Sequence, residues 1–151
     1  MAVIGTMKRV RRFTLFVKTP EKNWLVPLHR DLSVPVREPV EGGGWSHWTT
    51  KGGTPYARPP RELLDRLLAV RVHLEETGPD NGALKVVPGS HLTSENEGPR
   101  ETPTVPRGGA FVMRPSLLHA SAKIRSGRRR VLHFVFGPPD PPGGAQWLFS
   151  F

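Results

Sequence analysis

The chain has 151 residues and no cysteine, and its 22 Lys and Arg against 13 Asp and Glu give a formal net charge of +9. This length suits one domain with a hydrophobic core but not two. The lack of cysteine excludes a disulfide framework, a thiolate-ligated zinc, an iron–sulfur cluster and a thiol nucleophile. No apolar run approaches the roughly 20 residues of a membrane span, and residues 1–10 have no signal-peptide pattern, so we expect a cytoplasmic protein.

Short alternating segments, separated by glycine and proline, make up most of the chain. Its 16 Gly and 17 Pro suit many short strands joined by turns. In the first segment the apolar residues Phe13, Leu15 and Val17 occupy every second position, as in a half-buried strand. Extended segments are predicted at 12–18, 24–36, 70–75, 83–87, 110–113, 117–124 and 131–136. This pattern predicts a mainly β, antiparallel sandwich or barrel, for which the jelly roll is a standard solution.

The segments between the strands include one long loop, one helix and a C-terminal tail. Residues 41–60 are rich in glycine and tryptophan, and at this length we predict a lid or binding loop. Leucines spaced for one apolar face predict a short helix over 61–68. Asp80-Asn81-Gly82 predicts a hairpin turn. The Pro- and Gly-rich tail, 137–151, is expected to fold back onto a single domain of residues 1–151.

One histidine and one aspartate form a pair on an extended segment, His29-Arg30-Asp31. Side chains two residues apart on a strand point to the same side, so His29 and Asp31 converge on one point. With a distant histidine, such a pair forms the two-histidine, one-carboxylate triad that binds Fe(II) and leaves positions open for a cosubstrate and O₂. The alternative is a chance pair without a metal.

The C-terminal half supplies a candidate for the distant histidine. His119 begins a predicted strand, and Arg130 opens the next strand 11 residues later. A metal-bound 2-oxo acid needs its far carboxylate held, and the planar guanidinium of arginine donates two parallel hydrogen bonds to a carboxylate. His119 is therefore a candidate for the third ligand, and Arg130 is a candidate for the carboxylate anchor. The alternative for residues 128–130 is a solvated strand entrance.

Three groups of motifs resemble the phytanoyl-CoA dioxygenase family, and in particular its small bacterial members. In chain order they are Lys18-Thr19-Pro20 with Trp24 and Leu28-His29-Arg30-Asp31; Asp80-Asn81-Gly82-Ala83-Leu84 with Pro88-Gly89-Ser90-His91; and Leu118-His119-Ala120-Ser121 with Arg129-Arg130-Val131. The resemblance runs in the same order from about Phe13 to Trp147. It implies a double-stranded β-helix (the jelly roll) with one short helix, using Fe(II), 2-oxoglutarate and O₂.

The resemblance also implies roles for individual residues. The iron ligands would be His29, Asp31 and His119. The far carboxylate of 2-oxoglutarate would bind Arg130 and Ser121, and Lys18 would bind the carboxylate nearer the metal. Trp48, or its rival Trp45, would line the substrate site, with His47 beside it. No catalytic group beyond the iron centre is expected. Family members often carry glutamine at the position of Arg30, whose side chain points away from the metal side, so we expect little chemical effect there.

The predicted reaction is hydroxylation of an aliphatic C–H bond of a small molecule, with release of succinate and CO₂. The positive charge suits an anionic substrate, and an uncovered sheet edge favours a homodimer. Two other functions are a non-catalytic jelly-roll binding protein and a nucleic-acid-binding domain using the basic clusters at 8–12 and 125–130. Neither cluster carries the interleaved aromatic residues that stack on bases, so nucleic acid is the least favoured partner, and no membrane partner is expected.

Overall fold

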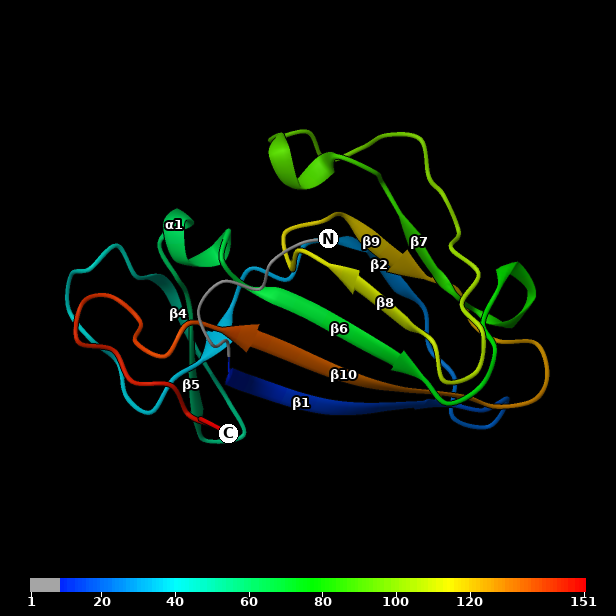
Figure 1. Ribbon diagram of the computed structural model, residues 1–151, viewed down its shortest axis with the longest axis horizontal. Coiled ribbons are helices and arrows are strands. Elements are labelled where there is room, and N and C mark those ends of the chain that lie inside the picture. Colours follow the sequence, from blue (N-terminus) through cyan, green and yellow to red (C-terminus); the bar gives the residue numbers. More distant parts are fainter. Residues whose placement is uncertain (1–8) are drawn as a thin grey trace.

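The computed structural model describes residues 9–151, and within this range the chain forms three antiparallel sheets (Figure 1). The largest sheet contains, in spatial order, β1 (Arg9–Lys18), β10 (Arg129–Gly137), β6 (Leu68–His73) and β8 (Ala110–Met113). The second contains β2 (Val26–His29), β9 (His119–Ser121) and β7 (Leu84–Val86). The third contains β3 (Val34–Pro35), β5 (Thr54–Arg58) and β4 (Ser46–Lys51), and lies near the helix α1 (Arg61–Leu64) at one end of the molecule.

The first two sheets define a jelly roll. From β6 onward, successive strands alternate between them, because β7 and β9 belong to the smaller sheet whereas β6, β8 and β10 belong to the larger one. The first and last strands of the chain are direct neighbours, and their pairing runs from Arg9 opposite Gly137 to Lys18 opposite Arg129. The prediction of a mainly β jelly roll with one short helix is confirmed.

The strand β10 shows how the larger sheet divides its two faces. Alternate residues are buried, and these are Arg129, Val131, His133, Val135 and Gly137. The residues between them are only half-buried, and these are Arg130, Leu132, Phe134 and Phe136. Because side chains alternate along a strand, Arg129 shares the inner face with His133, and Arg130 lies on the outer face. This division decides which arginine can reach the interior.

Three local predictions from the sequence are wrong. Residues 41–60 are not an open loop, since most of them form the hairpin of β4 and β5. The helix predicted over 61–68 ends at Leu64, and Leu68 already begins β6. Asp80-Asn81-Gly82 is not a hairpin turn, because Asp80 and Asn81 belong to a 3₁₀ helix, Pro79–Asn81, that Gly82 ends and that lies between strands of different sheets. In the described part of the chain, no helix is long and apolar enough to cross a membrane.

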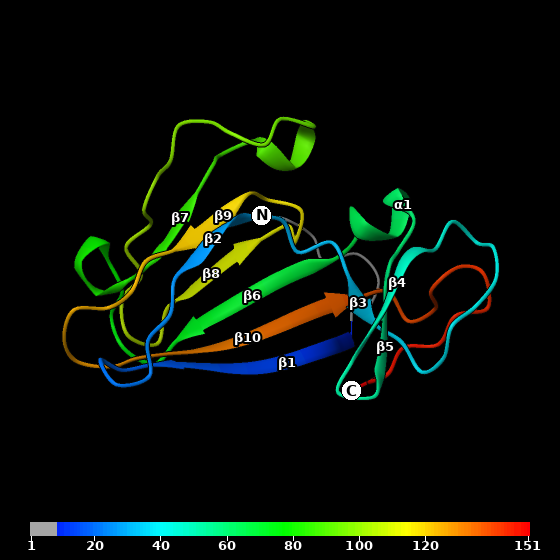
Figure 2. The same cartoon turned by 180° about the vertical axis from the view of Figure 1, so that it is seen from behind.

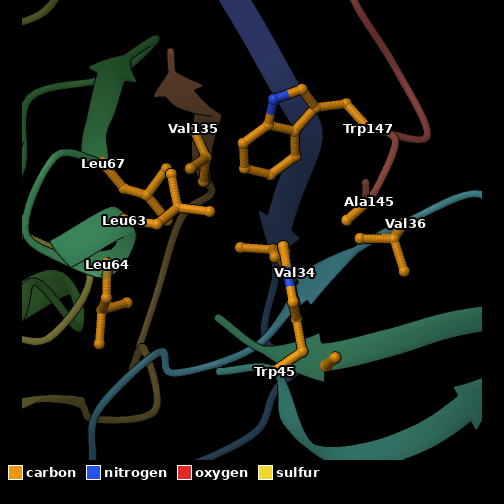
Figure 3. Packing of buried hydrophobic residues seen from close by; sticks show 10 residues of the cluster. Val34, Val36, Trp45, Leu63, Leu64, Leu67, Val135, Ala145 and Trp147 are labelled. Carbon is orange, nitrogen blue, oxygen red and sulfur yellow. The ribbon is translucent and has the colours of Figure 1, made fainter. Parts of the chain in front are cut away.

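The main hydrophobic core lies at the end of the molecule that carries the third sheet (Figure 3). Trp147, from the C-terminal tail, is 4% exposed and packs with Leu67 and Val135, so the tail folds back onto the domain as expected. Its indole N–H donates to the carbonyl of Pro138. A smaller cluster, which includes Leu84, Val86 and Met113, lies between the first two sheets. Most of the other residues that line that interior are charged or polar.

Candidate metal centre

His29 and His119 face each other across the pairing of β2 with β9. They are direct cross-strand partners in the antiparallel register, although 90 residues separate them in the chain. Residues directly opposite in such a pair have Cβ atoms about 4.5–5.5 Å apart, which brings their side chains into contact. The two imidazole rings accordingly lie with their centroids 4.3 Å apart. Strand pairing therefore brings the two predicted histidines to one point.

Asp31 completes a three-residue cluster two positions after His29. Its backbone N–H donates to the carbonyl of Pro115 at 2.9 Å, which holds this part of the chain beside the segment leading to His119. One carboxylate oxygen of Asp31 lies 3.4 Å from Nε2 of His29, and the other lies 3.6 Å from Nε2 of His119. Two ligand atoms at right angles on a metal, each about 2.1 Å from it, lie about 3 Å apart. With one ligand atom taken from each residue, the three atoms lie within 4.8 Å of one another, so the side chains would draw together around a bound ion.

Backbone carbonyls fix the tautomers of both histidines. Nδ1 of His29 lies 2.8 Å from the carbonyl oxygen of Pro27, and Nδ1 of His119 lies 2.8 Å from that of Leu117. A carbonyl can only accept, so each Nδ1 carries the proton. In the neutral form of either ring the lone pair is on Nε2, the atom that faces Asp31, whereas protonation of His29 lets its Nε2 donate to that carboxylate. Metal-binding histidines are oriented in this way.

The three side chains perturb one another's protonation. Burial alone would raise the pKa of Asp31, but the hydrogen bond from His29 and the charges of His119 and His29 outweigh burial and lower this pKa to about 2. The hydrogen bond to Asp31 raises the pKa of His29. Burial lowers the pKa of His119. At neutral pH the cluster thus presents one carboxylate and, on His119, a neutral imidazole.

A cavity of about 240 Å³ adjoins the three residues and extends into the jelly roll. It is lined by Arg12, Phe16, Lys18, Trp24, Val26, His29, Asp31, Arg71, Leu84, His119, Ser121, Arg129 and His133. Among the described residues, Asp31 is the only carboxylate in this lining, whereas four lining residues are lysine or arginine. Charged groups are costly to bury without a counterion. The lining of the cavity therefore carries more positive than negative charge within the described residues.

Lys18 and Ser121 lie together in the cavity wall, although the sequence analysis assigned them to different carboxylates of 2-oxoglutarate. The Lys18 ammonium donates to the hydroxyl of Ser121 and to the carbonyl of Ala122, both at 2.9 Å. It also lies 4.9 Å from the centre of the Trp24 ring. Burial, together with the charges of Arg129 and Arg71, lowers the pKa of Lys18 to about 8. Lys18 is therefore mostly cationic at neutral pH, although its neighbours repel its charge.

Arg129, and not Arg130, lies in the cavity. Arg129 is 3% exposed, and no carboxylate of residues 9–151 lies within ion-pair distance of it. Arg130 is on the outer face of β10, where its guanidinium contacts Glu75 at 2.7–2.8 Å. Arg130 therefore does not line the cavity, and Arg129 does, because alternate residues of a strand point to opposite faces.

Two buried arginine nitrogens in the cavity lack partners. Nε of Arg71 and Nε of Arg129 have no hydrogen-bond acceptor within the described residues. A terminal nitrogen of Arg71 lies 3.1 Å from Nδ1 of His133, whose pKa is lowered to about 4 by burial and by Arg71. Burial lowers the pKa of both arginines to about 10, so both stay charged at neutral pH. Free donors and uncompensated charge fit a dicarboxylate such as 2-oxoglutarate.

The residues predicted for the substrate site lie elsewhere. Trp45 is in the main core, and its indole N–H donates to the carbonyl of Pro142. Trp48 stacks on Trp45, with the two ring centroids 6.2 Å apart. His47 is exposed and contacts the hydroxyl of Ser46. None of these three residues lines the cavity. Hairpin formation explains the difference, because β4 and β5 direct the tryptophans toward the C-terminal tail. The aromatic residues of the cavity are instead Phe16 and Trp24.

Fold and site together define the class of this chain: a jelly roll in which two histidines and one carboxylate meet beside an interior lined by cationic side chains. Residues 3–132 match the phytanoyl-CoA dioxygenase (PhyH) family, and the chain belongs to that family.

Relatives in this and similar families share parts of their length with this chain. The dioxygenase himG of Aspergillus japonicus is 39% identical over 77 residues, which are 48% of this chain and 24% of that protein. The crystal structure of AviO1 from Streptomyces viridochromogenes Tue57 is 25% identical, with a TM-score of 0.59, and the match covers 86% of this chain and 51% of AviO1. HygX from Streptomyces hygroscopicus, with nickel and 2-oxoglutarate bound, shares the fold at 17% identity and a TM-score of 0.58, over 90% of this chain and 58% of HygX. The chain spans less than two thirds of the length of each relative.

Proposed function

We propose that this chain is an Fe(II)- and 2-oxoglutarate-dependent dioxygenase that hydroxylates an aliphatic C–H bond of a small molecule. The observation that carries the proposal is the meeting of His29, Asp31 and His119 within 4.8 Å, at the wall of a cavity lined by buried cations. A metal centre without such a cavity would have no place for a dicarboxylate. A cationic cavity without the three residues would only bind anions.

Each part of the site has a role in this proposal. His29, Asp31 and His119 would bind Fe(II) from one side and leave the other coordination positions open. When bound, iron and 2-oxoglutarate supply the oxidising chemistry, in which 2-oxoglutarate, O₂ and the C–H bond give succinate, CO₂ and an alcohol. Arg129 would bind the far carboxylate of 2-oxoglutarate, assisted by Ser121. Lys18, which donates to Ser121 and pairs across the strands with Arg129, would hold a carboxylate of the same molecule, and Phe16 and Trp24 would exclude water.

The charge balance of the cavity supports an anionic substrate. The two charges of the metal ion and the charges of Lys18, Arg71 and Arg129 exceed the three negative charges of Asp31 and bound 2-oxoglutarate by two. Arg12 adds a further cation to the lining. A substrate with a carboxylate or phosphate group would reduce this excess, which raises its local concentration and its affinity. Since Arg11, Lys18, Arg71 and Arg129 are buried, part of the basic charge is not available to nucleic acid.

Succinate formation tests the proposed function. With Fe(II), ascorbate, O₂ and 2-oxoglutarate, we expect slow succinate release without substrate, and faster release with anionic aliphatic compounds than with their neutral amides. The Asp31→Ala variant is the control and should release no succinate above the protein-free background. Wild-type protein that binds 2-oxoglutarate but never releases succinate would favour the non-catalytic binding protein instead.

We also propose a homodimer through the outer face of the larger sheet. Phe13, Leu15 and Val112 on this sheet are 54%, 48% and 55% exposed, and the half-buried Phe134 contacts Phe13 beside them. Contiguous exposed apolar residues of this kind mark interaction surfaces. Sedimentation equilibrium of the wild type and of Phe13→Ser should give a dimer and a monomer, respectively; a monomeric wild type would contradict the proposal.

A further inference from the structure

Arg30, which follows β2 and lies between the metal-ligand candidates His29 and Asp31, binds four backbone carbonyls. Its Nη1 donates to the carbonyls of Ser90 and Ser116, both at 2.6 Å. Its Nη2 donates to the carbonyls of Glu95, at 2.5 Å, and Thr93, at 3.3 Å. The N–H groups of both terminal nitrogens are therefore used, and none of the acceptors is a side chain. Such a contact holds chain segments in place and does not neutralise charge.

The four carbonyls belong to two segments, one after β7 and one before His119. Ser90, Thr93 and Glu95 lie in the segment after β7, which passes on the far side of β2 and β9 from the larger sheet (Figure 2). Ser116 lies in the turn that leads to His119, and the hydroxyl of Ser90 accepts a hydrogen bond from the N–H of Leu118 in the same turn. Arg30 thus connects the strand of His29 and Asp31 to the turn before His119.

The position of this turn affects the metal centre directly. The carbonyl of Pro115 accepts the backbone N–H of Asp31, and the carbonyl of Leu117 accepts Nδ1–H of His119. A shift of the turn would move the imidazole of His119 relative to the carboxylate of Asp31. Nη1 of Arg30 donates to the carbonyl of Ser116 in this turn and to the carbonyl of Ser90, whose hydroxyl also contacts the turn. These contacts limit that shift.

The number and plane of the donors make arginine specific for this role. A guanidinium has five N–H groups in a fixed plane, whereas a glutamine amide has two and a lysine ammonium is a compact charge on a flexible chain. Glutamine at position 30 could bind at most two of the four carbonyls. The unbound carbonyls would have to take up water or shift, and either change loosens the turn.

We propose that Arg30 is a positioning residue that fixes the distance between His119 and the His29–Asp31 pair. This inference rests on the proposed function, because it concerns the same metal centre. It also revises the expectation that the residue between the two ligands has little effect. Residues that orient metal ligands from outside the coordination sphere change metal affinity by about 10–100-fold when they are replaced.

Metal binding by the metal-free protein tests this role without turnover. Titration with Co(II), followed by the visible spectrum of the ion, gives both the affinity and the coordination geometry. We expect Arg30→Ala to bind Co(II) about 10–100-fold more weakly than the wild type and with an altered spectrum. The Co(II) affinity of Arg30→Gln should lie between those of Arg30→Ala and the wild type. Millimolar guanidinium, which can occupy the four-carbonyl site, should restore affinity and spectrum in Arg30→Ala, whereas equal urea should not. Arg58→Ala is the matched control, because Arg58 lines the neighbouring cleft but binds none of the four carbonyls.

The outcomes separate this inference from the function on which it rests. Affinity and spectrum equal to wild type in Arg30→Ala would overturn the positioning role and leave the metal centre intact. If Arg30→Ala does not fold, the same equality in Arg30→Gln overturns it. A wild-type protein that binds no Co(II) would refute the metal centre itself. A loss of stability with unchanged Co(II) spectrum and affinity would show that Arg30 is only structural, and would also overturn the inference.

Discussion

Replacement of Arg129 by alanine is expected to weaken 2-oxoglutarate binding by about 30-fold or more. Arg129 is 3% exposed in the cavity and has no carboxylate partner within residues 9–151. Truncating one partner of a buried, hydrogen-bonded charge pair costs about 2–5 kcal/mol, and each 1.4 kcal/mol is a factor of about ten in affinity. Calorimetric titration of 2-oxoglutarate into the Mn(II)-loaded protein measures the effect.

Arg130→Ala is the matched control for this prediction. The side chain of Arg130 is on the outer face of β10, and its guanidinium contacts Glu75. Its loss should leave the affinity for 2-oxoglutarate within about twofold of the wild type, since exposed ion pairs contribute little. The opposite pattern, with binding lost in Arg130→Ala and retained in Arg129→Ala, would show that the inner face of β10 is assigned incorrectly.

Replacement of His119 by alanine is expected to remove tight metal binding. Structural zinc sites with four ligands bind with about 10–16 kcal/mol, or about 3 kcal/mol per ligand, so one lost ligand should weaken binding by about 100-fold or more. Ni(II) titration, with metal content measured after dialysis, gives the result. Circular dichroism of the variant establishes that the loss is not unfolding, because His119 is 4% exposed.

His47→Ala provides the comparison for His119→Ala. His47 is exposed on β4 and does not line the cavity, although the sequence placed it near the substrate. Its removal should leave Ni(II) affinity unchanged. Equal losses in both variants would mean that the titration reports nonspecific binding to surface histidines and not a defined centre.

Much of the metal centre could be predicted from the chain because two of its residues are close in sequence. His29 and Asp31 lie two positions apart on an extended segment, and strand geometry alone directs both to one side. The position of His119 is different, since its pairing with His29 depends on the register of β2 and β9. No local pattern encodes that register. The family resemblance supplied it.

The one-residue error at Arg130 has a physical origin in β10. The strand is apolar on both faces, with Leu132, Phe134 and Phe136 outside and Val131 and Val135 inside, so hydrophobic alternation does not distinguish the faces. A usable signal was nevertheless present. If His133 is taken as a buried histidine, residues two and four positions before it share its face, and Arg129 follows as the inner arginine.

The tryptophans of residues 41–60 could not be placed from local sequence because their partners are far away. Trp45 packs with Trp147 in the core, and its indole N–H binds the carbonyl of Pro142. Close backbone contact supports this arrangement, since a Cβ on Gly43 would lie 2.7 Å from Cα of Gly143. A segment rich in glycine and tryptophan resembles a binding loop by composition. Here the same composition serves the attachment of the C-terminal tail.

The mutual repulsion of Lys18, Arg71 and Arg129 has a consequence for folding. Their pKa values are all lowered, Lys18 and Arg71 partly by the neighbouring positive charges, so each stays charged at a cost in free energy. A dianion that enters this interior relieves that cost only in the native state, and therefore shifts the folding equilibrium toward it. Bound 2-oxoglutarate would thus raise the free energy of unfolding of the chain, in addition to its role in the proposed reaction.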